Sequence, residues 1–214
     1  MNYEGIVITK LAHDGFKIKA DKVVYIDPFK LESESEKADL VLITHEHYDH
    51  CSIDDVKKVS NQNTIIITVA DCQSKLSGLD VKNITLVEPG NKVRLLGLEI
   101  EVVPAYNVDK FRSPGIPFHS KENNWVGFII TVNDKRIYHA GDTDKIPEMS
   151  DLKDIDVALL PVSGTYVMTA TEAAQACKLI NPKLAIPMHY GSIVGTTTDA
   201  ETFKRLAPCR VEIL

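Results

Sequence analysis

The stretch LVLITHEHYDH, residues 40–50, decides the architecture of this chain of 214 residues. Its first four residues are apolar and of strand length, which predicts a buried strand at the centre of a sheet. His45, His47, Asp49 and His50 follow at once, and a turn at the strand end can direct several side chains into one cavity. Imidazole and carboxylate groups at this density are typical metal ligands, and packing explains them poorly because each buried imidazole needs a hydrogen-bond partner.

Two further candidate ligands follow later apolar runs. Asp142 lies in HAGDT, residues 139–143, and His189 lies in PMHYG, residues 187–191. Each residue taken alone is more typical of an ordinary turn. Because each stands at the end of a predicted strand, as the first cluster does, we expect both to join that cluster. Two metal ions about 3.5–4 Å apart can share one carboxylate in such a site.

Short runs rich in Val, Ile and aromatic residues recur along both halves of the chain, separated by turn residues. They predict strands at residues 5–11, 16–20, 23–26, 40–43, 64–69, 92–96, 99–103, 126–132, 136–139, 157–160 and 185–187. Polar capping residues indicate three helices. Ser52 precedes the first helix, Thr169 with Glu172 begins the second, and Thr198 with Glu201 begins the third.

The order of these elements favours an α/β (α+β) fold. Two mixed β-sheets packed face to face, with helices outside, would bury the apolar strands of both halves. Periodicity alone does not fix that arrangement. No internal repeat, low-complexity tract or Pro/Gly-rich linker divides residues 1–214, so we predict a single domain.

The bulk composition limits the partners that we expect. The net charge of −6 offers no broad positive field for a nucleic acid. No apolar run approaches the length of about 20 residues that spans a bilayer, and the N-terminal residues lack a signal-peptide core. The four cysteines stand far apart, which fits a reducing compartment. We therefore expect a cytoplasmic protein with a small-molecule substrate and no nucleic-acid or membrane partner, and a homo-oligomer stays open.

The motif His45-Glu46-His47-Tyr48-Asp49-His50, followed by Gly141-Asp142-Thr143 and by His189, resembles the metallo-β-lactamase superfamily. Leu11-Ala12-His13 and Ile26-Asp27-Pro28-Phe29 are similar to the opening strands of one subgroup, the small metal-dependent hydrolases of the ascorbate-lactonase type. The resemblance implies a four-layer αββα sandwich with the metal ions at one edge, between the sheets. His13 and Asp27 are then expected either to orient the ligands or to make purely structural hydrogen bonds.

The resemblance also implies a ligand set for two ions. It assigns His45 and His47 to the first ion. It assigns Asp49, His50 and His189 to the second ion, and Asp142 to both as a bridge.

One position departs from the family pattern. A further histidine of the first site is expected after the strand 99–103, and the residue there is Asn107. Asn offers a metal only a weaker, neutral carbonyl oxygen. His119, in the long loop 111–124, is the nearest replacement. The sequence leaves open whether His119 is a ligand or an exposed loop residue.

The predicted chemistry is hydrolysis of a small phosphodiester, lactone or related ester by metal-activated water. One or two divalent ions, zinc before manganese or iron, would lower the pKa of water from about 15.7 to about 7. We expect Asp49 or Asp142 to accept the proton and His189 to orient the reactants or to stabilise developing charge. The alternative is a non-catalytic or regulatory metal-binding module with an incomplete first site, which Asn107 motivates.

Overall fold

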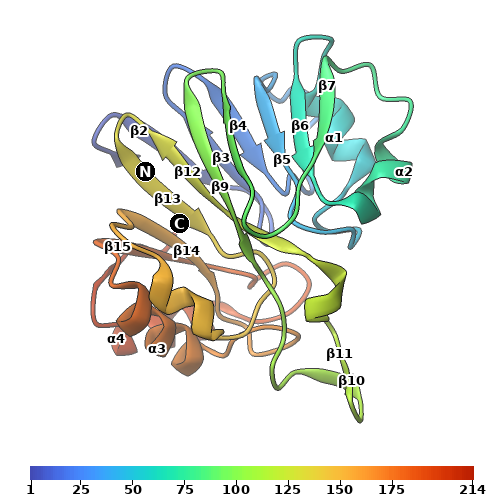
Figure 1. Cartoon of the computed structure of the whole chain (residues 1–214). Coiled ribbons are helices and arrows are strands. Elements are labelled where there is room, and N and C mark those ends of the chain that lie inside the picture. The colour runs from blue at the N-terminus through green and yellow to red at the C-terminus, as the bar shows by residue number, and fades with distance from the viewer.

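The first half of the chain forms a seven-stranded sheet in which the strand order follows the chain. A computed structural model, shown in Figure 1, describes all 214 residues. Strands β1 to β4 pair antiparallel, and β4 to β7 pair parallel. The strands are β1 (Asn2–Tyr3), β2 (Ile6–Lys10), β3 (Phe16–Lys19), β4 (Val23–Ile26), β5 (Leu40–Leu42), β6 (Ile65–Thr68) and β7 (Asn83–Leu86).

The second half forms another seven-stranded sheet, in the order β16-β15-β14-β13-β12-β9-β8. It is also mixed, because β8, β9, β12 and β13 pair antiparallel and β13 to β16 pair parallel. The strands are β8 (Lys92–Leu95), β9 (Leu98–Pro104), β12 (Val126–Val132), β13 (Lys135–His139), β14 (Val157–Pro161), β15 (Leu184–Met188) and β16 (Arg210–Val211). A separate hairpin, β10 (Phe111–Ser113) and β11 (Ile116–Pro117), lies between β9 and β12 in the chain.

Helices flank both sheets (Figure 1). α1 (Ile53–Val59) and α2 (Gln73–Leu76) lie beside the first sheet, and α3 (Ala170–Ile180) and α4 (Thr197–Leu206) lie beside the second. α3 contacts β14, and α4 contacts β15. Short 3₁₀ helices span Ala70–Cys72, Lys121–Asn123 and Pro147–Asp151. Buried apolar residues from both sheets join one core of 59 residues. The predicted αββα sandwich of two mixed sheets is therefore confirmed.

Every strand that the sequence predicts is present, and those that it missed share a physical reason. The apolar run at residues 40–42 forms β5, which is fully buried between β4 and β6. The missed strands β1, β7 and β16 are edge strands, and the missed hairpin β10–β11 stands outside both sheets. Because an edge strand is partly exposed and short, it carries little of the apolar pattern on which strand prediction depends.

Two helix starts follow capping boxes, whereas Ser52 stands at the start of α1 but donates its hydroxyl to the Asp55 side chain and caps no backbone amide. Thr169 Oγ1 accepts a hydrogen bond from the Glu172 amide, and the Glu172 carboxylate accepts one from the Thr169 amide. Helix α3 thus begins as predicted, whereas α4 begins earlier, with Thr196 and Asp199 as its capping box. The prediction from Thr198 was wrong because both threonines precede an acidic residue at the same spacing. None of the helices combines the length and the apolar character that a membrane span requires.

The strands carry the predicted ligands to one edge of the sandwich. His45 follows β5, Asp142 follows β13, and His189 follows β15. Because β13, β14 and β15 are parallel, Asp142 and His189 lie at the same edge of the second sheet. The parallel pair β4 and β5 does the same for Asp27 and His45 in the first sheet. The site therefore forms where the carboxyl ends of both sheets meet.

Replacing Thr169 by Ala removes the hydroxyl that caps α3, and we expect a loss of about 1 kcal/mol in the free energy of unfolding. Urea denaturation followed by circular dichroism measures it. Thr171→Ala is the matched control, because Thr171 is an exposed residue of the same helix and Ala is the better helix former. Equal stability of the two variants would contradict the cap.

Candidate metal centre

All seven histidines of the chain lie in or beside one cluster at the edge where the sheets meet. The ring centroid of His45 lies 4.0 Å from that of His50, and the ring centroid of His13 lies 4.0 Å from that of His189. All of them except His47 are at most 1% exposed. Buried imidazoles at this density require ligands or hydrogen-bond partners. The seven are His13, His45, His47, His50, His119, His139 and His189.

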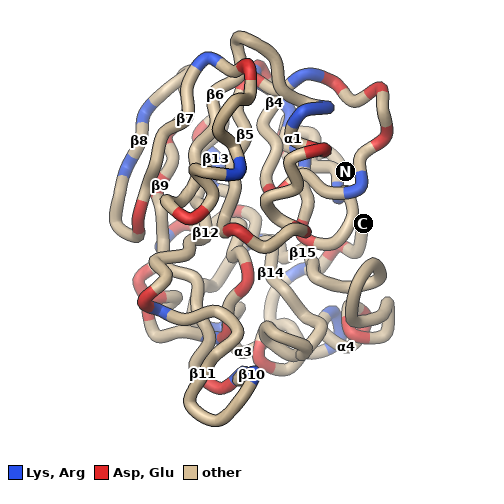
Figure 2. Tube along the Cα trace, turned by 90° about the vertical axis from the view of Figure 1, so that its right-hand side faces the viewer, with Lys and Arg blue, Asp and Glu red and all other residues tan.

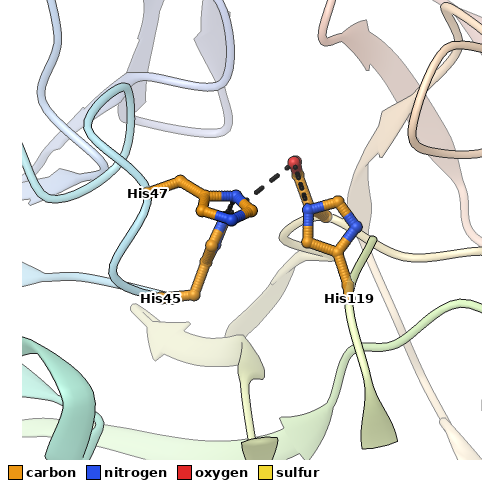
Figure 3. A group of neighbouring side chains, drawn as sticks. His45, His47 and His119 are labelled. Atoms are coloured by element: carbon orange, nitrogen blue, oxygen red, sulfur yellow. Dashed lines mark hydrogen bonds and ion pairs between the residues drawn. The ribbon is translucent and has the colours of Figure 1, made fainter. Parts of the chain in front are cut away.

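Four side chains form a first potential metal site. His45, His47, His119 and Asp142 each offer one ligand atom, and these atoms all lie within 4.8 Å of one another. Oδ2 of Asp142 lies 3.2 Å from Nε2 of His119 and 3.9 Å from Nε2 of His45. Figure 3 shows the rings of His45 and His47 on one side, facing His119 on the other. Three imidazoles and one carboxylate form a donor set that suits zinc.

Asn107, which stands where the resemblance leads us to expect a histidine, supports this group from outside it. Its Oδ1 accepts the His119 backbone amide at 2.8 Å and lies 2.9 Å from His119 Nδ1. Its Nδ2 donates to the Tyr166 carbonyl at 2.8 Å. Because Oδ1 can only accept, Nδ1 of His119 carries the proton and Nε2 keeps its lone pair toward Asp142. The structure brings His119, and not Asn107, into the group, so the first site is not left incomplete.

The residues predicted for the second ion lie in two adjoining groups. Asp49 and His50 form one group with His13, while His189 forms the other with Asp142 and an unpredicted residue, Asp14. The groups meet at Asp142. Its Oδ1 lies 3.4 Å from His50 Nε2, whereas its Oδ2 lies 3.2 Å from His119 Nε2 and 3.4 Å from His189 Nε2. The carboxylate thus lies between histidines of the first group and histidines predicted for the second ion.

Asp27 fixes the turn that carries the first motif. Its carboxylate accepts hydrogen bonds from the Thr44 amide at 2.8 Å and from the Thr44 hydroxyl at 2.7 Å. The same carboxylate lies 2.8 Å from His50 Nδ1, so that Nδ1 donates and Nε2 faces the cluster. Of the two roles that the sequence left open for Asp27, this geometry favours orientation of a ligand. His13 Nε2 lies 3.3 Å from Asp49 Oδ2, an ion-pair contact rather than a hydrogen bond.

His139 connects two turns behind the cluster. Its Nε2 donates to the Asp14 carbonyl at 2.8 Å, and its Nδ1 accepts from the Gly141 amide at 3.2 Å. Gly141 has a φ of +64°, and a Cβ atom there would lie 2.7 Å from the Val126 carbonyl oxygen. Only glycine fits this position. The turn that presents Asp142 therefore requires glycine at position 141.

Burial and mutual repulsion keep two histidines of the first group neutral. Burial holds the pKa of His45 well below its usual value. Burial and the neighbouring His119 lower the pKa of His47 to about 4. Both imidazoles therefore offer free lone pairs at neutral pH, which metal binding requires.

At the other end of the cluster, burial and neighbouring charges shift the pKa values of two carboxyl groups and one histidine. Burial acts to raise the pKa of Asp142, but His50 and His189 hold it well below the usual value. Asp142 and Asp27 in turn raise the pKa of His50 against the effect of burial. The pKa of Asp14 is raised by burial and by the charge of Asp142. Asp142 is thus an anion, and a second buried carboxyl group, that of Asp14, lies close to it and 4.0 Å from His50 Nε2.

Several buried polar atoms of the cluster have no hydrogen-bond partner, which tests whether a metal fits. Such atoms are rare in folded proteins, because each costs about 1–3 kcal/mol. Divalent cations bind nitrogen and carboxylate oxygen atoms of this kind, so the residues present fit bound metal. The unpartnered atoms are His13 Nδ1 and Nε2, Asp14 Oδ1 and Oδ2, His50 Nε2 and Asp142 Oδ1.

Asp14 is the member of the cluster that sequence reasoning missed. It is completely buried and follows His13 in the turn between β2 and β3. Its neighbour His13 was weighed as a residue that orients ligands. The only signal in the sequence is an acidic residue directly after His13, and that signal is weak because Asp-Gly is typical of an ordinary turn.

Comparisons with known proteins agree with this geometry. A family model described as a beta-lactamase superfamily domain matches residues 7–189. A UPF0173 metal-dependent hydrolase of Methanopyrus kandleri is 34% identical, and the match covers 92% of this chain and 90% of that protein. A solved structure of a candidate metal-dependent hydrolase from Parabacteroides distasonis is 34% identical, with a TM-score of 0.82 and coverage of 97% and 92%. Igni18, a metallo hydrolase from Ignicoccus hospitalis, shares the fold at 24% identity and a TM-score of 0.75, with coverage of 98% and 94%.

Replacing Asn107 by Ala should weaken metal binding at the first group by on the order of 10–100-fold, because His119 loses the acceptor that orients it. Competition between the metal-free protein and a zinc-binding dye measures the affinity. Asn107→Asp keeps an acceptor at Oδ1 and should retain most of it. Asn63→Ala, at an exposed loop position, is the control. Wild-type affinity in Asn107→Ala would show that Asn107 does not position a ligand.

Proposed function

Because this chain belongs to the β-lactamase superfamily and is a metal-dependent hydrolase, we propose that it cleaves a small anionic ester, foremost a phosphodiester. We also propose a centre of two divalent ions, with zinc in the histidine-rich first group. Membership of a hydrolase family argues against the non-catalytic module that Asn107 motivated. The observation that carries the substrate proposal is a pocket with one cationic side chain over the metal-binding cluster.

The pocket has a volume of about 390 Å³ and opens directly onto the cluster. This size fits a small molecule rather than a polymer segment buried along its length. Its lining includes members of all three potential metal-binding groups, so a bound substrate lies against both ends of the centre. The lining residues are His13, His47, Tyr48, Asp49, Arg112, Phe118, His119, Asp142, Tyr166, His189, Ile193 and Val194.

Arg112 is the only lysine or arginine in this lining. It lies in the hairpin β10–β11, and its Nη2 donates to the Phe118 carbonyl at 3.3 Å. No carboxylate pairs with it among the ion pairs of the structure. A guanidinium with free donors binds phosphate or carboxylate oxygens well. We therefore assign Arg112 to an anionic group of the substrate.

The hairpin that carries Arg112 is held against the second half of the chain. Lys110, just before β10, pairs with Glu172 of α3 at 3.0 Å, and the hairpin projects at the lower end of the molecule (Figure 2). The rings of Phe118 and Tyr166 meet edge to face, with centroids 4.7 Å apart. This aromatic pair and the nearby Ile193 form an apolar wall. The pocket thus suits an organic leaving group beside an anion.

Different residues of the chain can accept a proton, orient a ring and hold the cluster together during hydrolysis. When bound, divalent ions supply Lewis acidity, which lowers the pKa of water toward about 7 and polarises a substrate oxygen. The Asp49 side chain is 13% exposed and lines the pocket, so Oδ2 is placed to accept the proton of the attacking water. Ser163 Oγ lies 2.8 Å from His189 Nδ1 and orients the ring, whose Nε2 faces Asp142 and the pocket. Asp142, at 4% exposure, holds the cluster together rather than moving a proton.

A lactone or other neutral ester is the second candidate. The apolar wall favours it, because an uncharged ester buries well against aromatic and aliphatic side chains. A neutral ester leaves the donors of Arg112 without an anionic partner. The two candidates therefore differ in their dependence on Arg112.

Replacing Arg112 by Ala should raise KM for a phosphodiester such as bis(p-nitrophenyl) phosphate about tenfold or more, with a smaller effect on kcat. One charge-assisted hydrogen bond to an anion contributes about 1.5–3 kcal/mol. Arg112→Lys should recover part of the loss, and hydrolysis of a neutral lactone should change little. If KM for the phosphodiester is unchanged, Arg112 does not bind substrate.

Replacing Asp49 by Ala should lower kcat by at least about 100-fold, the smaller end of what a proton acceptor contributes. Steady-state assays at saturating metal, together with analysis of bound metal, separate loss of chemistry from loss of ions. Asp54→Ala, at an exposed position in α1, is the control. Full activity of Asp49→Ala would rule out this assignment.

A further inference from the structure

Asp14 differs from the other buried aspartates of the chain. Both of its carboxylate oxygens lack any hydrogen-bond partner, although the residue is 0% exposed. By contrast, Asp27 holds Thr44 and His50, and Asp156 holds the Arg136 amide at 2.9 Å and Lys183 at 2.8 Å. Its one ionic neighbour, His50 Nε2 at 4.0 Å, is too far away for a hydrogen bond, and a buried carboxylate without hydrogen bonds is strongly unfavourable. A bound cation would satisfy it.

The Asp14 carboxylate points into the second half of the cluster. Its Oδ2 lies 4.0 Å from Nε2 of His50, an atom that is also unpartnered. One of its oxygens lies within 4.8 Å of ligand atoms of both Asp142 and His189. The four residues thus present donors toward a common space.

The backbone holds Asp14 in this place from both sides. Its carbonyl accepts from His139 Nε2 at 2.8 Å, and the next residue, Gly15, allows a close turn. A Cβ atom on Gly15 would lie 2.9 Å from the Asp27 carbonyl oxygen and 3.0 Å from that of Ala12. The turn is therefore built around a backbone that cannot move outward to expose the carboxylate.

We propose that Asp14 is a further ligand of the second metal ion, which then takes a five- or six-coordinate cation such as Mn²⁺. Three carboxylates, from Asp14, Asp49 and Asp142, would surround this position together with His50 and His189. Oxygen-rich sets of this size suit hard ions with high coordination numbers, whereas the first group suits tetrahedral zinc. The centre is thus built for two unlike ions.

This inference rests on the two-ion centre of the proposed function but not on the proposed substrate. Metal binding is therefore measured without substrate. A single bound equivalent would overturn both the two-ion centre and the role of Asp14. Two equivalents without turnover of any phosphodiester would contradict only the substrate.

The test compares metal-free wild-type protein with Asp14→Asn, which keeps the shape but removes the charge. Equilibrium dialysis against Mn²⁺ alone should show the second equivalent weakened at least about tenfold, the lower end for loss of a partner at a metal site. Zn²⁺ should lose less, because four ligands remain for it. Retained Mn²⁺ affinity, within twofold, would overturn the proposal.

Thermal unfolding separates a ligand from a structural carboxylate. Without metal, Asp14→Asn should be at least as stable as the wild type, because it removes an unpaired buried charge. Its gain in Tm on adding Mn²⁺ should be smaller than that of the wild type, since binding to the folded state is weaker. A structural role predicts a lower Tm without metal and an unchanged Mn²⁺-dependent gain. Asp156→Asn is the matched control, since it removes a buried charge outside the cluster and should leave the Mn²⁺-dependent gain unchanged.

A measurement on the unaltered protein makes the test independent of whether a variant folds. Co²⁺ absorbs visible light strongly in a four-coordinate site and weakly in a five- or six-coordinate one. Titration of wild-type protein with Co²⁺ should therefore give one strongly and one weakly absorbing equivalent. Two equally intense equivalents would show that the second site has no further ligand and would overturn the proposal.

Discussion

The buried carboxylate of Asp142 ties the two halves of the fold together at the site. Its oxygens lie between 3.2 and 3.9 Å from ring nitrogens of His45, His50, His119 and His189. His45 and His50 lie in the segment after β5 of the first sheet. Asp142 and His189 follow strands of the second sheet. A charge at 5% exposure must be paired, or its burial costs several kcal/mol. The relative placement of the sheets is therefore constrained by this one group, and the surrounding turns are shaped to meet it.

Three residues in those turns adopt backbone conformations that are unfavourable for residues other than glycine. His13, Asp27 and His189 all have positive φ values, of 58°, 44° and 58°, which side chains other than glycine seldom adopt. Asp27 and His189 stand directly after β4 and β15, and His13 lies in the turn between β2 and β3. Asp27 accepts a hydrogen bond from the His50 ring, and His139 bonds to the backbone at Asp14 and Gly141, yet several polar atoms of the cluster stay unpartnered. Unfavourable backbone conformations and unpartnered buried polar atoms occur together at this edge of the sandwich, which is typical of a functional site.

This contrast explains how much of the molecule the sequence could predict. The central strands and the first motif were predictable because each is recognised within a short stretch of sequence. The apolar run LVLI indicates a buried strand, and the string from His45 to His50 indicates a metal site. The partner of His119 was not, because Asn107 and His119 meet only after the loop 107–119 folds back on itself. Asp14 was not either, since an aspartate before glycine is typical of an ordinary turn. Its role depends on strands far away in the chain, which place His50, His139 and Asp142 around it.

Burial and access to the pocket distinguish candidate ligands that can only bind an ion from those that can also react. His45, His50 and Asp14 are almost fully buried, and none of them lines the pocket. His13, His47, Asp49, His119, Asp142 and His189 belong to the same groups and do line it. A residue without access to substrate or water cannot exchange a proton with either, so the buried members can only hold and tune the ions. Asp49 and Asp14 are both carboxylates of the second half, but only Asp49 lines the pocket, so Asp49 is the one of the two placed for the proposed proton transfer. The order in which side chains approach the pocket thus determines their roles, and their chemical type alone does not.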